Sequence, residues 1–477
     1  MTHIFKNTSM IIFGTVFFLV ACQNDALLQE VVENTIPERT TIVKAPCTTI
    51  VSMDDAKRVA SLFDETEGKS RTLKVIKEIK VVKDEKGKPS IYVVNFANNQ
   101  GFVLVSATRN FLPVLAYNNE GNFTIPEENV NGVSLWLEKS KQNVKIADTL
   151  PADSTARFRS EWKKYEEQSS LSLTESRSTN NELDQYAIQL TSQWQQNGIE
   201  WCSLEDAQEF LPASQYQTWS ELVAGAVDPS YIDINPLTYS FVVTEITDYG
   251  SGSVENFTYT NWNQLNGYNA SILAAGKGPY AGCTTIAMAQ IMKYYGYPAN
   301  KNWNDMPNDN ATTTTANFIH EVANTIGVTY YPNVTTAGID QVKNAFNTYG
   351  YYNEIEEHDI NSVINELENR RPVFMIGYPS NYQTGHAWVA SGCAVSRYQK
   401  NYLLYVPVQN ASLGNPYFNI DTYLAEASNL AYFYMNWGED IDRVANGYYN
   451  DYDLTIPNWT NFNYLRHNLV NIKPINY

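Results

Sequence analysis

The sequence predicts an α+β protein of two unequal domains, and three observations support this. The chain has 477 residues, more than one typical domain, and 43% of them are hydrophobic, enough for sizeable cores. Helical and strand-like patterns occur before residue 160 and again after residue 256, with a polar Ser/Thr-rich stretch between them. In the second region a cysteine, Cys283, opens a strongly helical run.

The N-terminus predicts export. Lys6 and the apolar run Met10–Ala21 have the form of a signal peptide, and the run is too short for a comfortable membrane span. It ends in Leu19-Val20-Ala21-Cys22, which resembles the bacterial lipobox, whose cysteine is lipidated and becomes the first mature residue. We therefore expect a signal peptide at residues 1–21 and a lipid anchor on Cys22. The protein would then belong to the cell envelope, at the outer membrane or cell surface, or be released from it; an ordinary secretory signal is the alternative.

Residues 51–160 predict a compact α+β unit. Met53–Phe63 carries apolar residues at helical spacing, and Val133–Lys141 indicates a second helix. A turn at Asp84–Pro89 joins the first two of four strand-like runs. These runs are Val75–Val82, Ile91–Phe96, Phe102–Ala107 and Pro113–Tyr117. The unit contains no cluster suited to catalysis.

Two polar stretches predict linkers, at residues 22–50 and 161–182. The second includes the Ser/Thr-rich run Ser169–Asn181, which cannot bury enough apolar surface to order itself and is a natural place for proteolysis. Residues 183–255 show no clear pattern. They belong either to the second domain or to a long inserted segment.

Residues 256–477 predict the larger α+β domain. The helix that begins at Cys283 ends near Tyr295, followed by Gly296 and Pro298, which are typical of a helix end. Further helices are predicted over Phe318–Ile326 and Ile339–Tyr349. Apolar runs predict strands at Val373–Gly377, Ala387–Ala394, Tyr432–Trp437 and Gly447–Asp451.

Charge and cysteine content narrow the possible partners. The net charge of −18 argues against nucleic acid or an anionic membrane surface as a binding partner. The five cysteines form neither a dense disulfide framework nor a metal-binding pattern. We expect no disulfide, metal or cofactor, with a Cys47–Cys202 bridge as the alternative.

Cys283 and His386 predict a nucleophile and its base. Cys283 follows a Gly-containing loop and begins a helix, where unpaired N–H groups and the helix dipole favour a thiolate. Of the five histidines, only His386 follows a glycine and begins a buried-looking strand. The imidazole would take the thiol proton, the thiolate would attack an acyl carbon, and the imidazolium would protonate the leaving amine.

Two further residues complete the predicted site. Asn436, in Tyr434-Met435-Asn436-Trp437-Gly438, is a candidate to orient the imidazole, with Trp437 shielding that bond from water. Gln264 is a candidate oxyanion donor beside the backbone N–H of Cys283. We expect Trp437, Gly385 and Gly282 to line the substrate cleft. A helix with the nucleophile at its start, packed on a sheet, is the papain-like arrangement.

The four segments resemble, in order, motifs of the streptopain family of secreted bacterial cysteine peptidases. They are Trp262-Asn263-Gln264, Gly282-Cys283-Thr284-Thr285, Gly385-His386-Ala387-Trp388 and Asn436-Trp437-Gly438. The resemblance implies a papain-like catalytic domain. The chain departs from the family at Glu439-Asp440-Ile441, where the family has a second tryptophan and a pair of glycines, and at Ser391, where it usually has aspartate.

The N-terminal unit resembles the inhibitory propeptide of the same family. Ser90–Phe96, Gly101–Ala107 and Pro113–Tyr117 match its strands. The resemblance implies a zymogen whose propeptide holds the site inactive until it is cleaved.

The function expected is therefore an exported, lipid-anchored cysteine endopeptidase that acts on protein or peptide substrates. Two alternatives remain open: a catalytically silent papain-like binding lipoprotein, and a cell-wall amidase of the NlpC type.

Overall fold

The fold is α+β, as the sequence predicts. The computed structural model describes residues 49–67, 74–126, 132–150, 155–165, 190–194, 200–226, 240–378, 385–409, 416–440, 446–451 and 466–475. The signal peptide, Cys22, Cys47 and Ser169–Asn181 lie outside these residues, so the expectations for them stay predictions.

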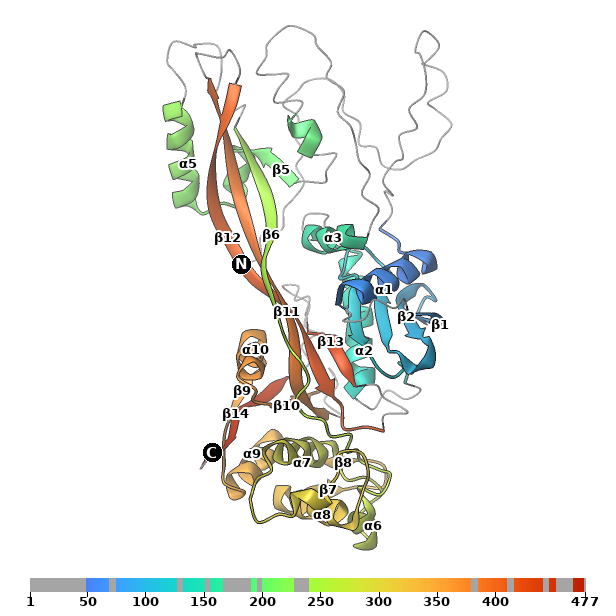
Figure 1. Ribbon diagram of the computed structural model, residues 1–477. Coiled ribbons are helices and arrows are strands. Elements are labelled where there is room, and N and C mark those ends of the chain that lie inside the picture. Colours follow the sequence, from blue (N-terminus) through green and yellow to red (C-terminus); the bar gives the residue numbers. More distant parts are fainter. Residues whose placement is uncertain are drawn as a thin grey trace.

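The N-terminal domain is a four-stranded antiparallel sheet with helices on both faces (Figure 1). Its strands pair in sequence order and match the four predicted runs: β1 (Ile76–Lys83), β2 (Pro89–Phe96), β3 (Phe102–Ser106) and β4 (Val114–Asn118). The helices are α1 (Met53–Glu67), α2 (Gly132–Ala147) and α3 (Ala156–Trp162), with short 3₁₀ turns at Ala97–Asn99 and Lys163–Tyr165.

Alternation along the strands explains the two helical layers. Val94 and Val105 face the core beneath α1, whereas Val93 and Leu104 face the core that includes α2. Successive side chains of a strand point to opposite faces, so two apolar faces need two covers. The helix that follows the sheet, α2, continues past the predicted Lys141 to Ala147.

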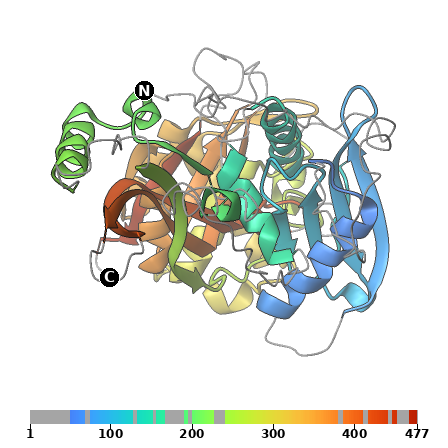
Figure 2. The ribbon, with the colours of Figure 1, turned by 90° about the horizontal axis from the view of Figure 1, so that it is seen from above.

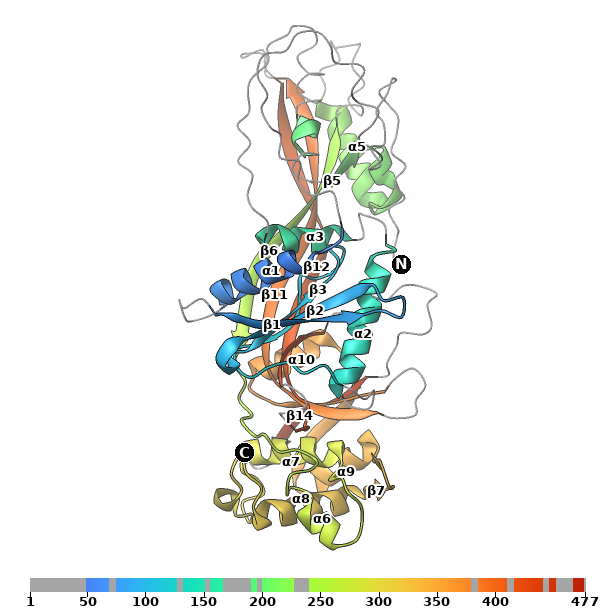
Figure 3. The same cartoon turned by 90° about the vertical axis from the view of Figure 1, so that its right-hand side faces the viewer.

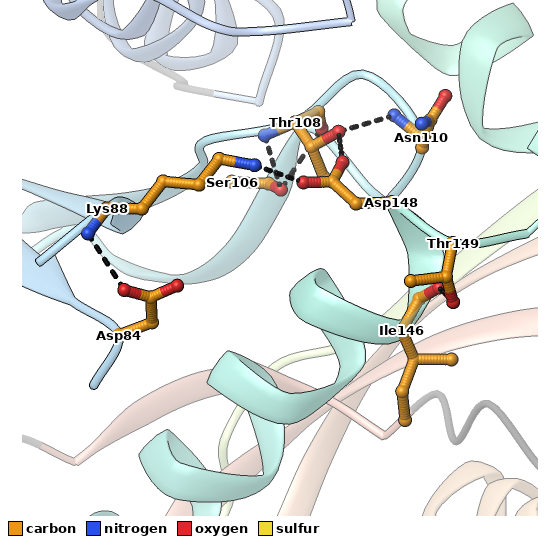
Figure 4. A network of polar contacts seen from close by, with 8 residues as sticks. All are labelled: Asp84, Lys88, Ser106, Thr108, Asn110, Ile146, Asp148 and Thr149. Carbon is orange, nitrogen blue, oxygen red and sulfur yellow. Dashed lines mark hydrogen bonds and ion pairs between the residues drawn. The ribbon is translucent and has the colours of Figure 1, made fainter. Parts of the chain in front are cut away.

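A polar network fixes the C-terminal end of α2 (Figure 4). Asp148 accepts hydrogen bonds from Thr108 Oγ1 at 2.5 Å and from Lys88 Nζ at 2.6 Å. The backbone N–H of Lys88 donates in turn to Asp84 in the β1–β2 turn. The helix is thereby tied to the sheet independently of its apolar face.

The second domain is built on an antiparallel sheet, whose strands differ in length, and on helices that cover it. Its core strands are β9 (Tyr351–Glu357), β10 (Val373–Gly377), β11 (His386–Gln409), β12 (Pro416–Asn436), β13 (Gly447–Asn450) and β14 (His467–Pro474). Its helices are α6 (Ala270–Ala274), α7 (Cys283–Tyr295), α8 (Thr313–Ile326), α9 (Ile339–Thr348) and α10 (Ile360–Glu368), with a 3₁₀ turn at Trp303–Asp305 and a small pair β7 (Thr329–Tyr330) and β8 (Thr335–Thr336). Ala387 and Val389 face the core with α7, whereas Trp388 and Ala390 face the opposite core.

The two domains share one sheet. β4 pairs with β13, placing Tyr117 opposite Tyr448 and Ala116 opposite Tyr449, so the strand order runs β1-β2-β3-β4-β13-β12-β11-β10-β14-β9. One hydrophobic core extends from Val93 and Leu104 of the N-terminal domain to Trp388 and Trp437 of the second. Both the sheet and the hydrophobic core therefore continue across the interface between the domains.

Residues within 183–255 form much of a protruding arm that the sequence did not predict. β6 (Phe241–Val254) runs along β11, and β5 (Glu200–Ser203) pairs with β6. α5 (Ala213–Ala226), preceded by a 3₁₀ turn at Asp206–Glu209, packs Trp219 against the far ends of β11 and β12. Figures 1 and 3 show the arm extending away from the helices α6–α9. In Figure 2, α5 (green) and the N-terminal domain (blue) lie at opposite sides.

Candidate active site

Cys283 is the first residue of α7, as predicted. The preceding Gly282 has φ +95°, a backbone conformation that L side chains rarely adopt. A Cβ there would also lie 3.1 Å from Thr335 Oγ1. Behind Cys283 the helix is buried from Thr284 to Met292, and it ends at Gly296 in the left-handed conformation. Glycines thus define both ends of a rigid helix that holds the thiol.

His386 begins β11 and lies beside Cys283. The strand pairs His386 with Gly377 of β10, and the residue is only 3% exposed. The Cys283 sulfur accepts a hydrogen bond from the backbone N–H of Ala387, the next residue of the strand. The start of α7 and the start of β11 therefore bring the predicted nucleophile and base together.

The imidazole of His386 is engaged elsewhere in this structure. Its Nε2 donates to the carbonyl oxygen of Trp437 at 2.8 Å. Asn436, the last residue of β12, accepts from Gln290 Nε2 at 3.1 Å and from the N–H of Gly438 at 3.2 Å. Its amide nitrogen donates to a backbone carbonyl, that of Thr260. Asn436 is thus near the site without a hydrogen bond to His386, and its orienting role stays a prediction.

Gln264 reaches the same site from the loop before α6. Its Nε2 donates to Oε1 of Glu439 at 2.7 Å. The same Oε1 lies 3.9 Å from Nδ1 of His386. Sequence reasoning gave Glu439 no function; the only signal was that it replaces the tryptophan of the family motif.

Burial makes the Cys283 thiol a weak acid in this structure. Desolvation, together with the charge of Glu439, raises the pKa of the Cys283 thiol to about 11. The backbone N–H groups of Ala387 and Thr284 act in the opposite direction and do not offset the burial. Desolvation in the precursor thus opposes the thiolate that a helix N-terminus favours, although the exposure of Cys283 is intermediate.

The N-terminal domain closes the site through the start of α2. A Cβ added to Gly132 would lie 2.5 Å from Cδ2 of His386 and 2.4 Å from Cε3 of Trp437. Only a glycine can approach the imidazole and indole this closely. Further along α2, Trp136 donates from Nε1 to the carbonyl of Asn450 at 3.0 Å.

Of the three residues predicted to line the substrate cleft, Gly282 precedes Cys283, and Trp437 and Gly385 are each packed against an aromatic ring. Trp437 is 1% exposed and packs against Trp388, with ring centroids 5.2 Å apart. Gly385 is packed against Tyr378, and a Cβ there would lie 2.6 Å from that ring. A cavity between α2 and the second domain is bordered by Gly132, Tyr378, Trp388 and Trp437, among others.

A second buried polar cluster includes Asp451 and Arg466, which also line this cavity. Asp451 contacts Nε2 of His358 at 2.5 Å and pairs with Arg466. Burial alone would raise the pKa of Asp451, but Arg466, His358 and Lys139 of α2 more than offset it and hold the pKa well below its usual range. The sequence placed His358 in an acidic loop and gave no sign of this pairing.

The fold and this arrangement define a thiol peptidase domain preceded by a domain that covers its site. Family models identify both parts: residues 48–144 match the Spi protease inhibitor family, and residues 262–305 and 299–449 match the Peptidase C10 family. The second domain thus matches the streptopain family and the N-terminal domain matches that family's inhibitory propeptide, which confirms the resemblance read from the sequence. No curated protein matches the chain.

The described residues contain no helix with the length and apolar character needed to cross a bilayer.

Proposed function

We propose that this cysteine peptidase, made as a zymogen, is an exported and lipid-anchored endopeptidase in which Cys283 attacks the peptide carbonyl and His386 moves the protons. The observation that carries the proposal is the placement of Cys283 at the start of α7, against the strand that His386 begins. The match to the Peptidase C10 family supports it, because residues 262–305 and 299–449 include Cys283 and His386.

The reaction would proceed in two steps. His386 takes the proton of Cys283, the thiolate adds to the carbonyl carbon, and the imidazolium gives its proton to the leaving amine, which leaves an acyl-enzyme. Water, deprotonated by His386, then releases the acyl group. Gln264 Nε2 and the Cys283 N–H would stabilise the oxyanion of each tetrahedral intermediate, and Asn436 would orient the imidazole once the ring leaves the Trp437 carbonyl.

The contacts of α2 support an inhibitory role for the propeptide. Gly132 packs on His386 and Trp437, so while α2 is docked a substrate cannot occupy that face of the imidazole. Cleavage between the domains, within residues 161–182, would allow α2 to leave. His386 would then be free to turn towards Cys283.

A thiol-directed experiment tests the proposal. The processed enzyme should hydrolyse casein, lose this activity with an epoxide-type thiol-protease inhibitor, and carry the inhibitor on Cys283. Cys283→Ala should be inactive, and His386→Ala should lose most activity. His320→Ala, outside the site, serves as the matched control. Casein hydrolysis by Cys283→Ala at the wild-type rate would refute the assignment.

One observation favours a catalytically silent scaffold as the second candidate. Glu439 accepts the hydrogen bond of the proposed oxyanion donor, Gln264, and its negative charge raises the pKa of the Cys283 thiol. A silent scaffold would show no inhibitor label on Cys283 even after the propeptide is removed.

Lipid anchoring rests on the sequence Leu19-Val20-Ala21-Cys22 alone. Cys22→Ser should release the protein from the membrane fraction or stop its processing. Normal membrane association of this variant would exclude the lipobox interpretation.

A further inference from the structure

Glu439 is directed into the active site by the turn that precedes it. Gly438 has φ +65°, and a Cβ there would lie 3.0 Å from Cγ2 of Ile286 in α7. The N–H of Gly438 is fixed by Asn436 Oδ1 at 3.2 Å. This turn belongs to the catalytic domain, so Glu439 stays in the site when the propeptide leaves.

The Glu439 carboxylate lies beside both the proposed oxyanion donor, Gln264, and the proposed base, His386. Its Oε1 is 2.7 Å from Gln264 Nε2, a separation typical of an oxyanion and its donor. It is also 3.9 Å from Nδ1 of His386. In the precursor Nε2 of His386 donates to Trp437, so Nδ1 is the ring nitrogen on the Glu439 side of the proposed base. Glu439 therefore lies beside the residue that would protonate the leaving amine, and the residue after the scissile bond would bind near it.

We propose that Glu439 is a specificity-determining residue that selects substrates with a lysine or arginine immediately after the scissile bond. The inference rests on the peptidase function proposed above. A cationic side chain at that position would meet a carboxylate with only 21% of its side chain exposed, where attraction is weakly screened. It would also give Glu439 a new partner, so that Gln264 can turn to the oxyanion.

Neutral and acidic residues at that position would have the opposite effect. With a neutral residue, Glu439 keeps its bond to Gln264, and part of the oxyanion stabilisation is lost. With an acidic residue, two carboxylates approach each other and the complex is further disfavoured. The expected order of kcat/KM is thus basic, then neutral, then acidic.

Three fluorogenic peptides that differ only in the residue after the scissile bond test this. They carry Lys, Gln or Glu there and are assayed with the processed enzyme. The wild type should prefer the Lys peptide to the Glu peptide by about tenfold or more in kcat/KM. Glu439→Gln, which keeps an acceptor for Gln264, should lower this ratio about tenfold, and Glu439→Lys should reverse the order. Asp440→Asn removes the same charge one residue away and should leave the ratio unchanged.

The possible failures are distinguishable. Equal ratios in the wild type and Glu439→Gln, or a uniform change for all three peptides, would overturn the specificity proposal and leave the peptidase function standing. Failure to cleave any peptide, together with an unlabelled Cys283, would overturn both.

Discussion

At the scale of single residues, the protonation state of Cys283 should differ between the precursor, in which the propeptide is docked, and the processed enzyme. Its pKa is raised to about 11 in the closed site, so the thiol is almost entirely protonated at neutral pH. We expect iodoacetamide to modify Cys283 of the precursor slowly at pH 7, with a rate that increases up to about pH 11. In the processed enzyme, where His386 can form an ion pair with the thiolate, the rate should already be high near pH 7. Peptide mass mapping against Cys393 as an internal control would measure both rates, and identical pH profiles would contradict the argument.

The contribution of Asp451 to the stability of the folded protein should decrease as the pH is lowered. Its pKa is depressed in the folded protein, so its contribution to stability is complete above the unfolded pKa of about 4 and falls by about 1.4 kcal/mol per pH unit below it. Asp451→Asn should cost about 3–5 kcal/mol at pH 6, because it leaves Arg466 without its charge partner. The difference between wild type and variant, measured by urea unfolding in the Cys283→Ala background, should shrink below pH 4. A constant difference from pH 6 to pH 2 would show that Asp451 is not the titrating group.

The sequence named candidate residues for the site but could not predict their contacts. Cys283, His386, Gln264 and Asn436 could be named because each lies in a short motif of fixed order. The bond from His386 to the Trp437 carbonyl depends on where α2 docks, which no local pattern encodes. The position of Glu439 depends on the left-handed conformation of Gly438.

At the scale of elements, the first turn of α2 controls access to the imidazole. Gly132→Val should disrupt the contact of α2 with His386 and Trp437, because a Cβ cannot fit within 2.5 Å of the ring. We expect the uncut precursor to gain measurable peptidase activity while α2 stays helical, since valine costs little in helix propensity compared with glycine. Gly225→Val, at a glycine near the end of α5 whose Cβ would meet nothing, is the matched control. Equal activity of the Gly132→Val and wild-type precursors would exclude this contact as the block.

Elements with a clear apolar pattern, such as α7 and β1–β4, were predicted well, and segments that depend on pairing without such a pattern were not. α7 was predicted from Cys283 to near Tyr295 because an apolar helix between two glycines has a clear pattern. β11 was expected to end at Ala394 but continues to Gln409. Its outer half carries polar residues such as Arg397 and Lys400 and is held by pairing with β12 and β6. β14 and α10 were likewise missed, since short amphipathic segments depend on the sheet they join.

At the scale of the whole molecule, the shared sheet makes the precursor one cooperative unit. β4 pairs with β13, and one hydrophobic core crosses from Leu104 to Trp437, so neither domain can unfold without exposing apolar surface of the other. The Cys283→Ala precursor, which cannot cut itself, should therefore unfold in a single thermal transition whose Tm does not depend on protein concentration.

Cutting the chain between the domains should change this behaviour in a predictable way. With a specific protease site inserted within residues 169–181 and cleaved, the propeptide becomes a separate ligand of the catalytic domain. Its stabilising effect then follows mass action, so Tm should fall after cleavage and rise again as the protein is concentrated. The uncut protein with the same insertion is the control. Two separate transitions in that uncut control would show that the domains are independent, and that the pairing of β4 with β13 contributes little to the stability of the precursor.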